Sequence, residues 1–367
     1  MRKQEIRHIV DGLGTHAILL EGASILVSGA AGFLGRWVIR TLDMLNATAL
    51  EEPCTVVAID AAAALGDVHR RWEYRKELLK PEHIEFQHHD LRAGLPHLTQ
   101  RFDYVLHMAG VASPYWYRKD PLLTIDIAVQ GSRQLLELAR RDHARYLFTS
   151  SSEVYQTPPA EMIPTPETYI GAVPSMGPRS CYDVSKLMGE TLAHTYAEVH
   201  GANTVVVRIH NTFGPGMREA DHRILPRIAS ALKGDREFVI YAADPEKMPT
   251  RTYCYVTDLV EGLFRALLFG EQSRVYNLGN DAPEVSTLEL CRVIEGLQNS
   301  RREVFLPKLR YRVEPPPAVY ADEPMRRCPD ITRARQELGY EPRVTLEDGV
   351  LRFLHWARDV YTGDPPP

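Results

Sequence analysis

A short apolar run leads into three closely spaced glycines, and a helical pattern follows at once. The run is Ser24-Ile25-Leu26-Val27-Ser28, and the turn is Gly29-Ala30-Ala31-Gly32-Phe33-Leu34-Gly35. Glycines in such a turn let the backbone approach a pyrophosphate, whose charge sits at the N-terminus of the next helix. Strand, glycine turn and helix in this order are typical of a dinucleotide site. The segment therefore predicts an α/β fold with a parallel sheet that binds ligands at the carboxyl ends of its strands.

The next two predicted strands each end near an acid. Residues 54–60 are Cys-Thr-Val-Val-Ala-Ile-Asp, so Asp60 closes the second strand 25 residues after Gly35. A carboxylate there accepts hydrogen bonds from an adenosine ribose and repels a 2′-phosphate, so NAD is favoured over NADP. Residues 85–91 predict a third strand, and its last two residues, Asp90 and Leu91, are expected to flank the adenine.

An aromatic segment follows the next predicted strand, residues 104–110. Residues 112–117, Ala-Ser-Pro-Tyr-Trp-Tyr, are expected to form a loop at the carboxyl edge of the sheet. Its rings suit either packing or ligand recognition, and the sequence leaves both readings open. Residues 122–141 then place apolar side chains at helical spacing.

A hydroxyl-rich strand end and a Tyr–Lys pair mark the middle of the chain. Residues 147–155, Leu-Phe-Thr-Ser-Ser-Ser-Glu-Val-Tyr, predict a buried strand that ends in hydroxyls and one carboxylate. Tyr182 and Lys186 are four positions apart at the start of a predicted helix, so their side chains share one face. The ammonium favours the phenolate, which would let Tyr182 exchange a proton near neutral pH.

Composition narrows the class of protein. The chain has 367 residues, which suits two domains or one large α/β domain with a smaller cap. Its net charge of −5 gives no reason to expect a nucleic-acid partner. The five cysteines form no CxxC pair, which argues against a metal site of the zinc type and against a disulfide framework, and fits a reducing cytoplasm. No apolar run approaches the roughly 20 residues that span a bilayer, and the N-terminus has no signal-peptide pattern, so no membrane partner is expected.

Four features together resemble the extended short-chain dehydrogenase/reductase family. They are the glycine turn, the acid that ends the second strand, the hydroxyl-ended strand and the Tyr182-x-x-x-Lys186 pair. Members of this family are nucleotide-sugar epimerases, dehydratases and decarboxylases. The resemblance implies a Rossmann fold, which is a doubly wound parallel sheet, with a smaller C-terminal α/β substrate-binding cap. It also implies a homodimer that pairs the helices starting near Leu122 and Tyr182. The implied division is an N-terminal extension (1–23), an NAD-binding domain (24–210, with 252–280 returning to it), a nucleotide-sugar-binding domain (211–251 and 281–358) and a tail (359–367).

The resemblance assigns roles to single residues. Tyr182 would deprotonate the C4 hydroxyl of the sugar, while Lys186 would hold the nicotinamide ribose and lower the pKa of the tyrosine. Ser151 or Thr149 would bond the same sugar oxygen. Asn211, in an NxxGP segment, would touch the sugar diphosphate, and Arg327, within residues 322–331, would pair with ribose or diphosphate. The implied NAD-binding residues are Gly29, Gly32, Phe33, Leu34, Gly35, Asp60, Asp90, Leu91, Met108, Ala109, Thr149, Tyr182 and Lys186. The implied nucleotide-sugar-binding residues are Pro114, Tyr117, Glu153, Asn211, Arg223, Arg251 and Arg327, and the catalytic set is Tyr182, Lys186, Ser151, Ser152, Glu153 and Arg251.

Within that family the chain most resembles the UDP-glucuronate decarboxylases. The segments that carry this likeness are 112–121, 151–155, 177–183 and the Arg-Cys-Pro-Asp-Ile run that begins at Arg327. The Ser152-Glu153 pair favours the same reaction. A 4,6-dehydratase of the dTDP-glucose type has an acid where Ser152 stands, and serine is too weak an acid to protonate a leaving hydroxyl.

Three alternatives stay open. A 4,6-dehydratase of the dTDP-glucose or GDP-mannose type is the first, and a C4 epimerase is the second. The third is a protein that is not an enzyme, either an NAD-sensing Rossmann protein or a catalytically inactive homologue. The sequence also leaves the nucleotide base open.

Overall fold

A seven-stranded sheet forms the core of the structure, a computed structural model that describes residues 3–61, 73–244, 246–300, 307–316 and 324–364. The strands lie in the order β11-β6-β5-β4-β1-β2-β3, and every neighbouring pair is parallel. Their bounds are β1 Ser24–Ser28, β2 Thr55–Asp60, β3 Ile84–His88, β4 Tyr104–His107, β5 Arg145–Ser151, β6 Thr204–Ile209 and β11 Arg274–Leu278. Because the strand order reverses beside β1, a crevice opens at the carboxyl ends of β1 and β4. The predicted Rossmann fold is confirmed.

Helices cover both faces of this sheet, as apolar parallel strands require. One face carries α2 (Phe33–Thr48), α9 (Val256–Phe269) and α11 (Thr332–Leu338). The other carries α6 (Ser132–Asp142) and α7 (Ser180–His200), and α5 (Pro121–Asp126) joins α6 through a π-helical turn at Ile127–Gly131. Two separate clusters of buried apolar side chains result, one on each side of the sheet.

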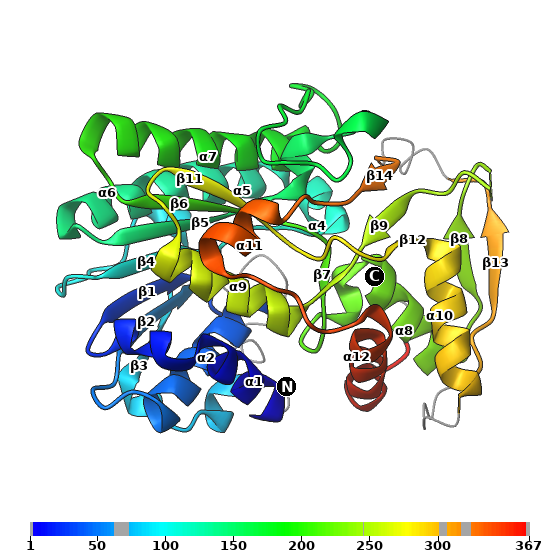
Figure 1. Cartoon of the computed structure of the whole chain (residues 1–367), viewed down its shortest axis with the longest axis horizontal. Coiled ribbons are helices and arrows are strands. Elements are labelled where there is room, and N and C mark those ends of the chain that lie inside the picture. Colours follow the sequence, from blue (N-terminus) through cyan, green and yellow to red (C-terminus); the bar gives the residue numbers. More distant parts are fainter. Residues whose placement is uncertain (1–2, 62–72, 245, 301–306, 317–323, 365–367) are drawn as a thin grey trace.

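A smaller α/β unit stands beside the carboxyl edge of the sheet, on the right in Figure 1. Its helices are α8 (Ile224–Lys233), α10 (Thr287–Asn299) and α12 (Leu346–Val360). Strand β8 (Phe238–Tyr241) pairs with β13 (Tyr311–Glu314). Strand β9 (Thr250–Thr252) lies between β12 (Glu284–Ser286) and β14 (Arg326–Arg327). Two short strands, β7 (Thr212–Phe213) and β10 (Cys254–Tyr255), pair where the chain passes between the two units.

The N-terminal residues belong to the folded core. Helix α1 (Lys3–Leu13) packs on α2 and α9, and a 3₁₀ helix, Gly14–Leu20, follows it. The side chains of Ile6, Ile9 and Leu13 are buried, and Glu5 accepts a hydrogen bond from the hydroxyl of Tyr255. The extension therefore covers α9 at the point where the chain returns from the smaller unit.

Two local expectations were wrong. The aromatic segment is not a loop, because α4 (Pro114–Lys119) starts at its proline, and proline suits the first position of a helix. The third strand ends at His88, so Asp90 and Leu91 follow it rather than close it. The first two residues of the predicted 322–331 segment lie outside the described residues. Within the described part of the chain, no helix is both long and apolar enough to cross a membrane.

Candidate active site

The glycine turn between β1 and α2 packs closely against the end of β4. Gly29 has φ +74°, and a Cβ there would lie 2.6 Å from the backbone nitrogen of Ala109. Glycine is needed here both for the turn and for the close approach. The turn borders a cavity whose lining includes Gly29, Gly32, Phe33 and Met108. Backbone N–H groups at the N-terminus of α2 suit a pyrophosphate in that cavity.

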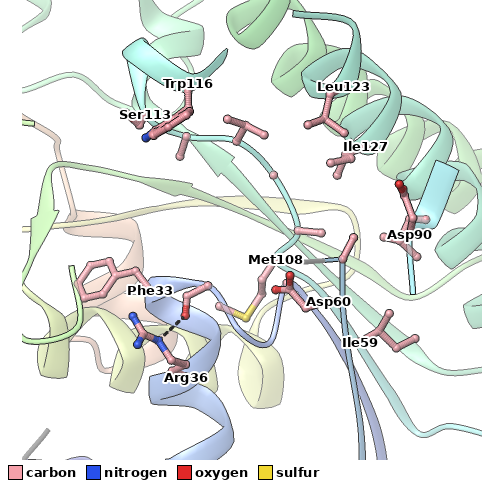
Figure 2. A pocket seen from close by; sticks show the side chains of 18 of the residues that line it. Phe33, Arg36, Ile59, Asp60, Asp90, Met108, Ser113, Trp116, Leu123 and Ile127 are labelled. Atoms are coloured by element: carbon pink, nitrogen blue, oxygen red, sulfur yellow. Dashed lines mark hydrogen bonds between the residues drawn. The ribbon is translucent and has the colours of Figure 1, made fainter. Parts of the chain in front are cut away.

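Two acidic side chains lie beside this cavity, one at the end of a strand and one shortly after a strand. Figure 2 shows Asp60, at the end of β2, close to Met108, with Asp90 further along the wall. The Asp60 carboxylate accepts a hydrogen bond from the backbone nitrogen of Ala31 at 3.0 Å, which fixes it at the place where a dinucleotide ribose is bound in such folds. Hydrogen bonding from Arg92 lowers the pKa of Asp90. The residues present fit a dinucleotide with free ribose hydroxyls, such as NAD.

Residues 214–223, which we call the bridging segment, lie across this cavity. On one side, Arg36 donates to the carbonyl of Gly216, and Trp37 Nε1 donates to the carbonyl of Pro215 at 2.8 Å. Figure 2 also shows Arg36 folded back onto the glycine turn, where its Nε donates to the carbonyl of Gly32. On the other side, Ser113 Oγ donates to the carbonyl of Asp221 at 2.6 Å, and Trp116 Nε1 to that of Ala220 at 2.8 Å. The segment is therefore held to both walls of the cavity by side-chain donors.

Tyr182 and Lys186 lie at the carboxyl end of β5, on buried positions of α7. The Nζ of Lys186 donates to the carbonyl of Thr149 at 2.7 Å and lies 5.8 Å from the centroid of the Tyr182 ring. The Tyr182 ring stacks on that of Tyr117, with centroids 5.0 Å apart and planes at 8°. The Thr149 hydroxyl donates to the carbonyl of His107 at 3.0 Å. The fold thus brings the predicted Tyr–Lys pair, the end of β5 and an aromatic side chain of α4 together.

Burial dominates the titration of this pair. It raises the pKa of Tyr182 to about 12, and hydrogen bonding from Ser151 is the largest effect that opposes it. Burial also lowers the pKa of Lys186 to about 8, with Glu190 acting in the opposite direction. In this structure the Lys186 ammonium points at a backbone carbonyl, and the pKa of Tyr182 is not lowered as the resemblance implied.

Glu153 sits between two arginines just after β5. Its carboxylate accepts hydrogen bonds from Arg179 and from both terminal nitrogens of Arg327, of which the Nη2–Oε2 pair is 2.8 Å apart. Burial opposes the ionised form of Glu153, but the charges of Arg327 and Arg179 outweigh it and hold the pKa at about 2. Arg327 Nη1 also lies 3.5 Å from the hydroxyl of Ser152. Glu153 is therefore ionised at neutral pH. Arg327, which the resemblance assigns to the ribose or diphosphate, donates to the Glu153 carboxylate in this structure.

A second, larger cavity extends from Tyr182, Lys186 and Glu153 to the smaller unit. Its lining includes side chains of the Rossmann unit and of the smaller unit: Pro114, Tyr117, Thr149, Ser151, Ser152, Glu153, Tyr182, Lys186, Asn211, Arg223, Arg251 and Arg327. Three of their polar atoms, Tyr117 Oη, Asn211 Nδ2 and Arg327 Nε, are buried without a hydrogen-bond partner among the described residues. Buried polar atoms of this kind need a partner, so they suit a polar ligand. Arg251 Nη1 is held by the carbonyl of Thr250 at 2.8 Å.

Several residues at the site were not singled out from the sequence. Arg179 and Asp183 stand in the segment that carried the family likeness, but no pattern predicted that Arg179 would pair with Glu153. Gln156 joins them through a hydrogen bond to Asp183 at 2.8 Å. Arg36 and Trp116 contact the bridging segment, which is far from both in sequence. Only the folded chain brings such residues together.

Known proteins are similar to this chain in sequence. Residues 25–279 match the NAD dependent epimerase/dehydratase family. UDP-glucuronic acid decarboxylase 5 of Arabidopsis thaliana is 37% identical over 327 residues, which cover 89% of this chain and 86% of that protein. UDP-glucuronic acid decarboxylase 1 of Xenopus tropicalis is 35% identical over 336 residues, 91% of this chain and 72% of that protein.

Solved structures agree on the architecture. The UDP-glucuronic acid 4-epimerase of Bacillus cereus, in complex with UDP-glucuronic acid and NAD, has a TM-score of 0.74 and 23% identity, and the match covers 92% of this chain and 100% of that one. The dTDP-glucose 4,6-dehydratase of Streptomyces venezuelae has a TM-score of 0.74 and 22% identity over 92% of this chain and 97% of that one. At this level of sequence identity the two structures support the fold alone. From its sequence match and its dinucleotide cavity, the chain belongs to the NAD-dependent epimerase/dehydratase family.

Proposed function

We propose that the protein is an NAD-dependent decarboxylase of UDP-glucuronate, which oxidises C4 of the sugar and releases the C6 carboxylate as CO₂. The observation that carries the proposal is Glu153 held between Arg179 and Arg327. These arginines and Arg251 surround the sugar end of the larger cavity with positive charge. An anionic sugar suits such a site better than a neutral hexose. The names of the relatives at 33–37% identity support the same substrate.

The state of Glu153 argues against the 4,6-dehydratase alternative. That reaction needs a base to remove the C5 proton and an acid to protonate the departing C6 hydroxyl. A carboxylate whose pKa is about 2 is a weak base, because an efficient catalytic base has a pKa near the working pH. Ser152 supplies no acid. Decarboxylation needs neither group, because the C5–C6 bond breaks without loss of a C5 proton.

The side chains of this protein act at two carbons of the sugar, C4 and C5. Tyr182 takes the proton of the C4 hydroxyl as a phenolate, which Ser151 stabilises by hydrogen bonding, and the neutral phenol returns that proton when the hydride comes back to C4. NAD, when bound, accepts the C4 hydride and returns it. With a carbonyl at C4 the sugar is a β-keto acid, so the C5–C6 electron pair moves onto the C4 oxygen as CO₂ leaves. Arg251 orients the carboxylate, and C5 is then protonated by a water held beside Ser152 and Glu153.

The cofactor and sugar roles follow the two units of the fold. We assign residues 24–210 and 252–280 to NAD, with Lys186 on the nicotinamide ribose, and residues 211–251 and 281–358 to the nucleotide sugar. The protein is proposed to work as a homodimer. On α5 and α7, Leu122 is 72% exposed and Met188 is 42% exposed, which supports an interface there. All five cysteines are free thiols in the structure, which supports a reducing compartment such as the cytoplasm.

The test is to supply purified protein with NAD and UDP-glucuronate and to follow the nucleotide products by mass. Release of CO₂ with a UDP-pentose, or with its 4-keto form, is the expected result. A UDP-hexuronate of unchanged mass but altered C4 configuration would identify an epimerase instead. Loss of water from a nucleotide hexose, with UDP-glucuronate untouched, would identify a dehydratase. Tyr182→Phe is expected to lower the rate of C4 oxidation by roughly 100-fold or more.

A further inference from the structure

A closed ring of polar contacts joins the turn that carries Glu153 to the first turn of α7. The Gln156 amide donates to the backbone carbonyl of Glu153 at 2.8 Å and to the carboxylate of Asp183 at 2.8 Å. The same Asp183 oxygen lies 3.7 Å from Nε of Arg179. Arg179 closes the ring by donating to the Glu153 carboxylate. One turn and one helix start are thus linked at both the backbone and the side chain of Glu153.

Gln156 occupies a backbone conformation that disfavours a side chain. Its φ is +55° and its ψ is −121°, a region that is populated mainly by glycine. A non-glycine residue there is strained, and such strain is concentrated at functional sites. The two hydrogen bonds from its amide offset part of that strain. The Gln156 side chain therefore links Glu153 to Asp183, which a glycine at this position could not do.

Asp183 directly follows Tyr182 and is fully buried. One of its carboxylate oxygens accepts from Gln156, and the other has no partner among the described residues. Burial, and then the charge of Glu153, raise the pKa of Asp183 to about 6. It is therefore ionised at neutral pH, which costs stability. The Asp183 and Glu153 carboxylates both pair with the Arg179 guanidinium.

We propose that Gln156 and Asp183 are positioning residues that fix Glu153, through Arg179, relative to Tyr182. This inference rests on the proposed function, because it concerns the two carbons on which that reaction acts. Tyr182 acts at C4, and Glu153 lies where the C5–C6 end of the sugar must be held. Hydride removal needs Tyr182 in place, whereas release of CO₂ also needs the sugar fixed at its other end. When the ring is broken, the first step persists and the second slows.

The experiment compares two steps in Gln156→Gly and Asp183→Asn. Stopped-flow absorbance at 340 nm follows the first reduction of bound NAD, and trapped labelled CO₂ follows the second step. We expect NAD reduction within about twofold of wild type, CO₂ release slowed roughly tenfold, and KM within about threefold. Because glycine accepts the backbone of residue 156 without strain, the Tm of Gln156→Gly should be unchanged or higher. The double variant should be no slower than the slower single variant, since both changes break the same ring.

A matched control is His143→Gly. His143 also has a positive φ of 58°, but it is an exposed residue at the end of α6. Its backbone is in the left-handed helical region (ψ 29°), and its replacement by glycine changes a positive-φ position outside the ring, so both steps should keep wild-type rates. Equal slowing of both steps together with a lower Tm would show a merely structural role and overturn the proposal. Unchanged CO₂ release in both single variants would also overturn it.

Failure of the proposed function gives a different result. Wild-type protein that forms no CO₂ from UDP-glucuronate contradicts the decarboxylase, whatever the variants do. The positioning role is then tested with the nucleotide sugar that the wild-type protein does convert. The quantity compared is the rate of NAD reduction divided by the rate of product formation. A ratio that stays at the wild-type value in Gln156→Gly and Asp183→Asn would reject the positioning role.

Discussion

The ring of Tyr117 lies face to face with the ring of Tyr182, with centroids 5.0 Å apart and planes at 8°. Tyr117 comes from α4 and Tyr182 from α7, so the stack joins two helices that flank the carboxyl edge of the sheet. Both rings are buried. The proposed acid–base residue therefore has an aromatic plane stacked on its ring and the Lys186 ammonium 5.8 Å from its ring centroid.

Replacing Tyr117 by leucine should loosen Tyr182. The change removes the stacking surface and leaves a cavity, which we expect to lower the free energy of unfolding by about 2–3 kcal/mol and kcat by roughly tenfold. Tyr117→Phe is the matched control, because it keeps the stack and removes only a hydroxyl that has no partner among the described residues. That variant should be at least as stable as wild type. Urea unfolding and steady-state kinetics measure both effects, and a kcat for the leucine variant equal to that of phenylalanine would contradict the stacking role.

Glu153 is expected to contribute to stability as well as to activity. Glu153→Gln leaves the nearly buried guanidinium of Arg327 without its anion and that of Arg179 with Asp183 alone. Removal of one partner from such a cluster costs about 3 kcal/mol, so the free energy of unfolding should fall by that order at pH 7. The charge-balanced variant Glu153→Gln/Arg179→Gln should recover part of the loss. Denaturant titration of the three proteins checks this, and equal stability of both variants would show that Arg179 is not the destabilised charge.

The sequence predicted the elements whose pattern is local. The glycine turn, the acid that ends β2, and the Tyr–Lys spacing on α7 each depend on a few adjacent residues, and the structure has the expected strand, turn and helix at each place. The aromatic segment was misread as a loop because its proline suits both a loop and the first turn of a helix. The contacts of Glu153 lay beyond such reasoning. Arg179 is 26 positions away and Arg327 is 174 positions away, and no short-range pattern specifies a contact over such separations.

The bridging segment should slow the exchange of NAD. Its backbone carbonyls accept hydrogen bonds from Arg36 and Trp116, which both line the cofactor cavity, so we expect the segment to hinder release of the cofactor. Trp116→Phe removes one donor and keeps most of the packing. Since a neutral hydrogen bond contributes about 0.5–1.5 kcal/mol, NAD dissociation should be roughly three- to tenfold faster. Displacement of NADH by excess NAD, followed by fluorescence, measures the rate. Trp356→Phe is the control, because that ring packs on Phe353 and Tyr361 in the smaller unit, and a similar acceleration there would reject the idea.

The buried ammonium of Lys186 should make stability depend on pH in the alkaline range. Burial lowers its pKa from 10.5 to about 8 in the folded protein, so between about pH 8 and 10.5 the unfolded chain binds more protons than the folded one. The free energy of unfolding then rises with pH in that window, because unfolding must take up a proton. The contribution is of the order of 3 kcal/mol, since one pKa unit corresponds to about 1.4 kcal/mol.

Lys186→Met isolates this effect, because methionine has a similar shape and no charge. The variant should exceed wild type in stability most clearly below about pH 8, where the lysine is charged in both states, and its advantage should shrink as the pH rises towards 10.5. Unfolding of the cofactor-free proteins in urea, at half-unit intervals from pH 7 to 10.5, measures the difference between them, in which the titrations of the other side chains cancel. A difference that stays constant across the whole range would mean that Lys186 keeps its ordinary pKa in the fold, and that its ammonium is better solvated than its burial beside Thr149 and Phe148 requires.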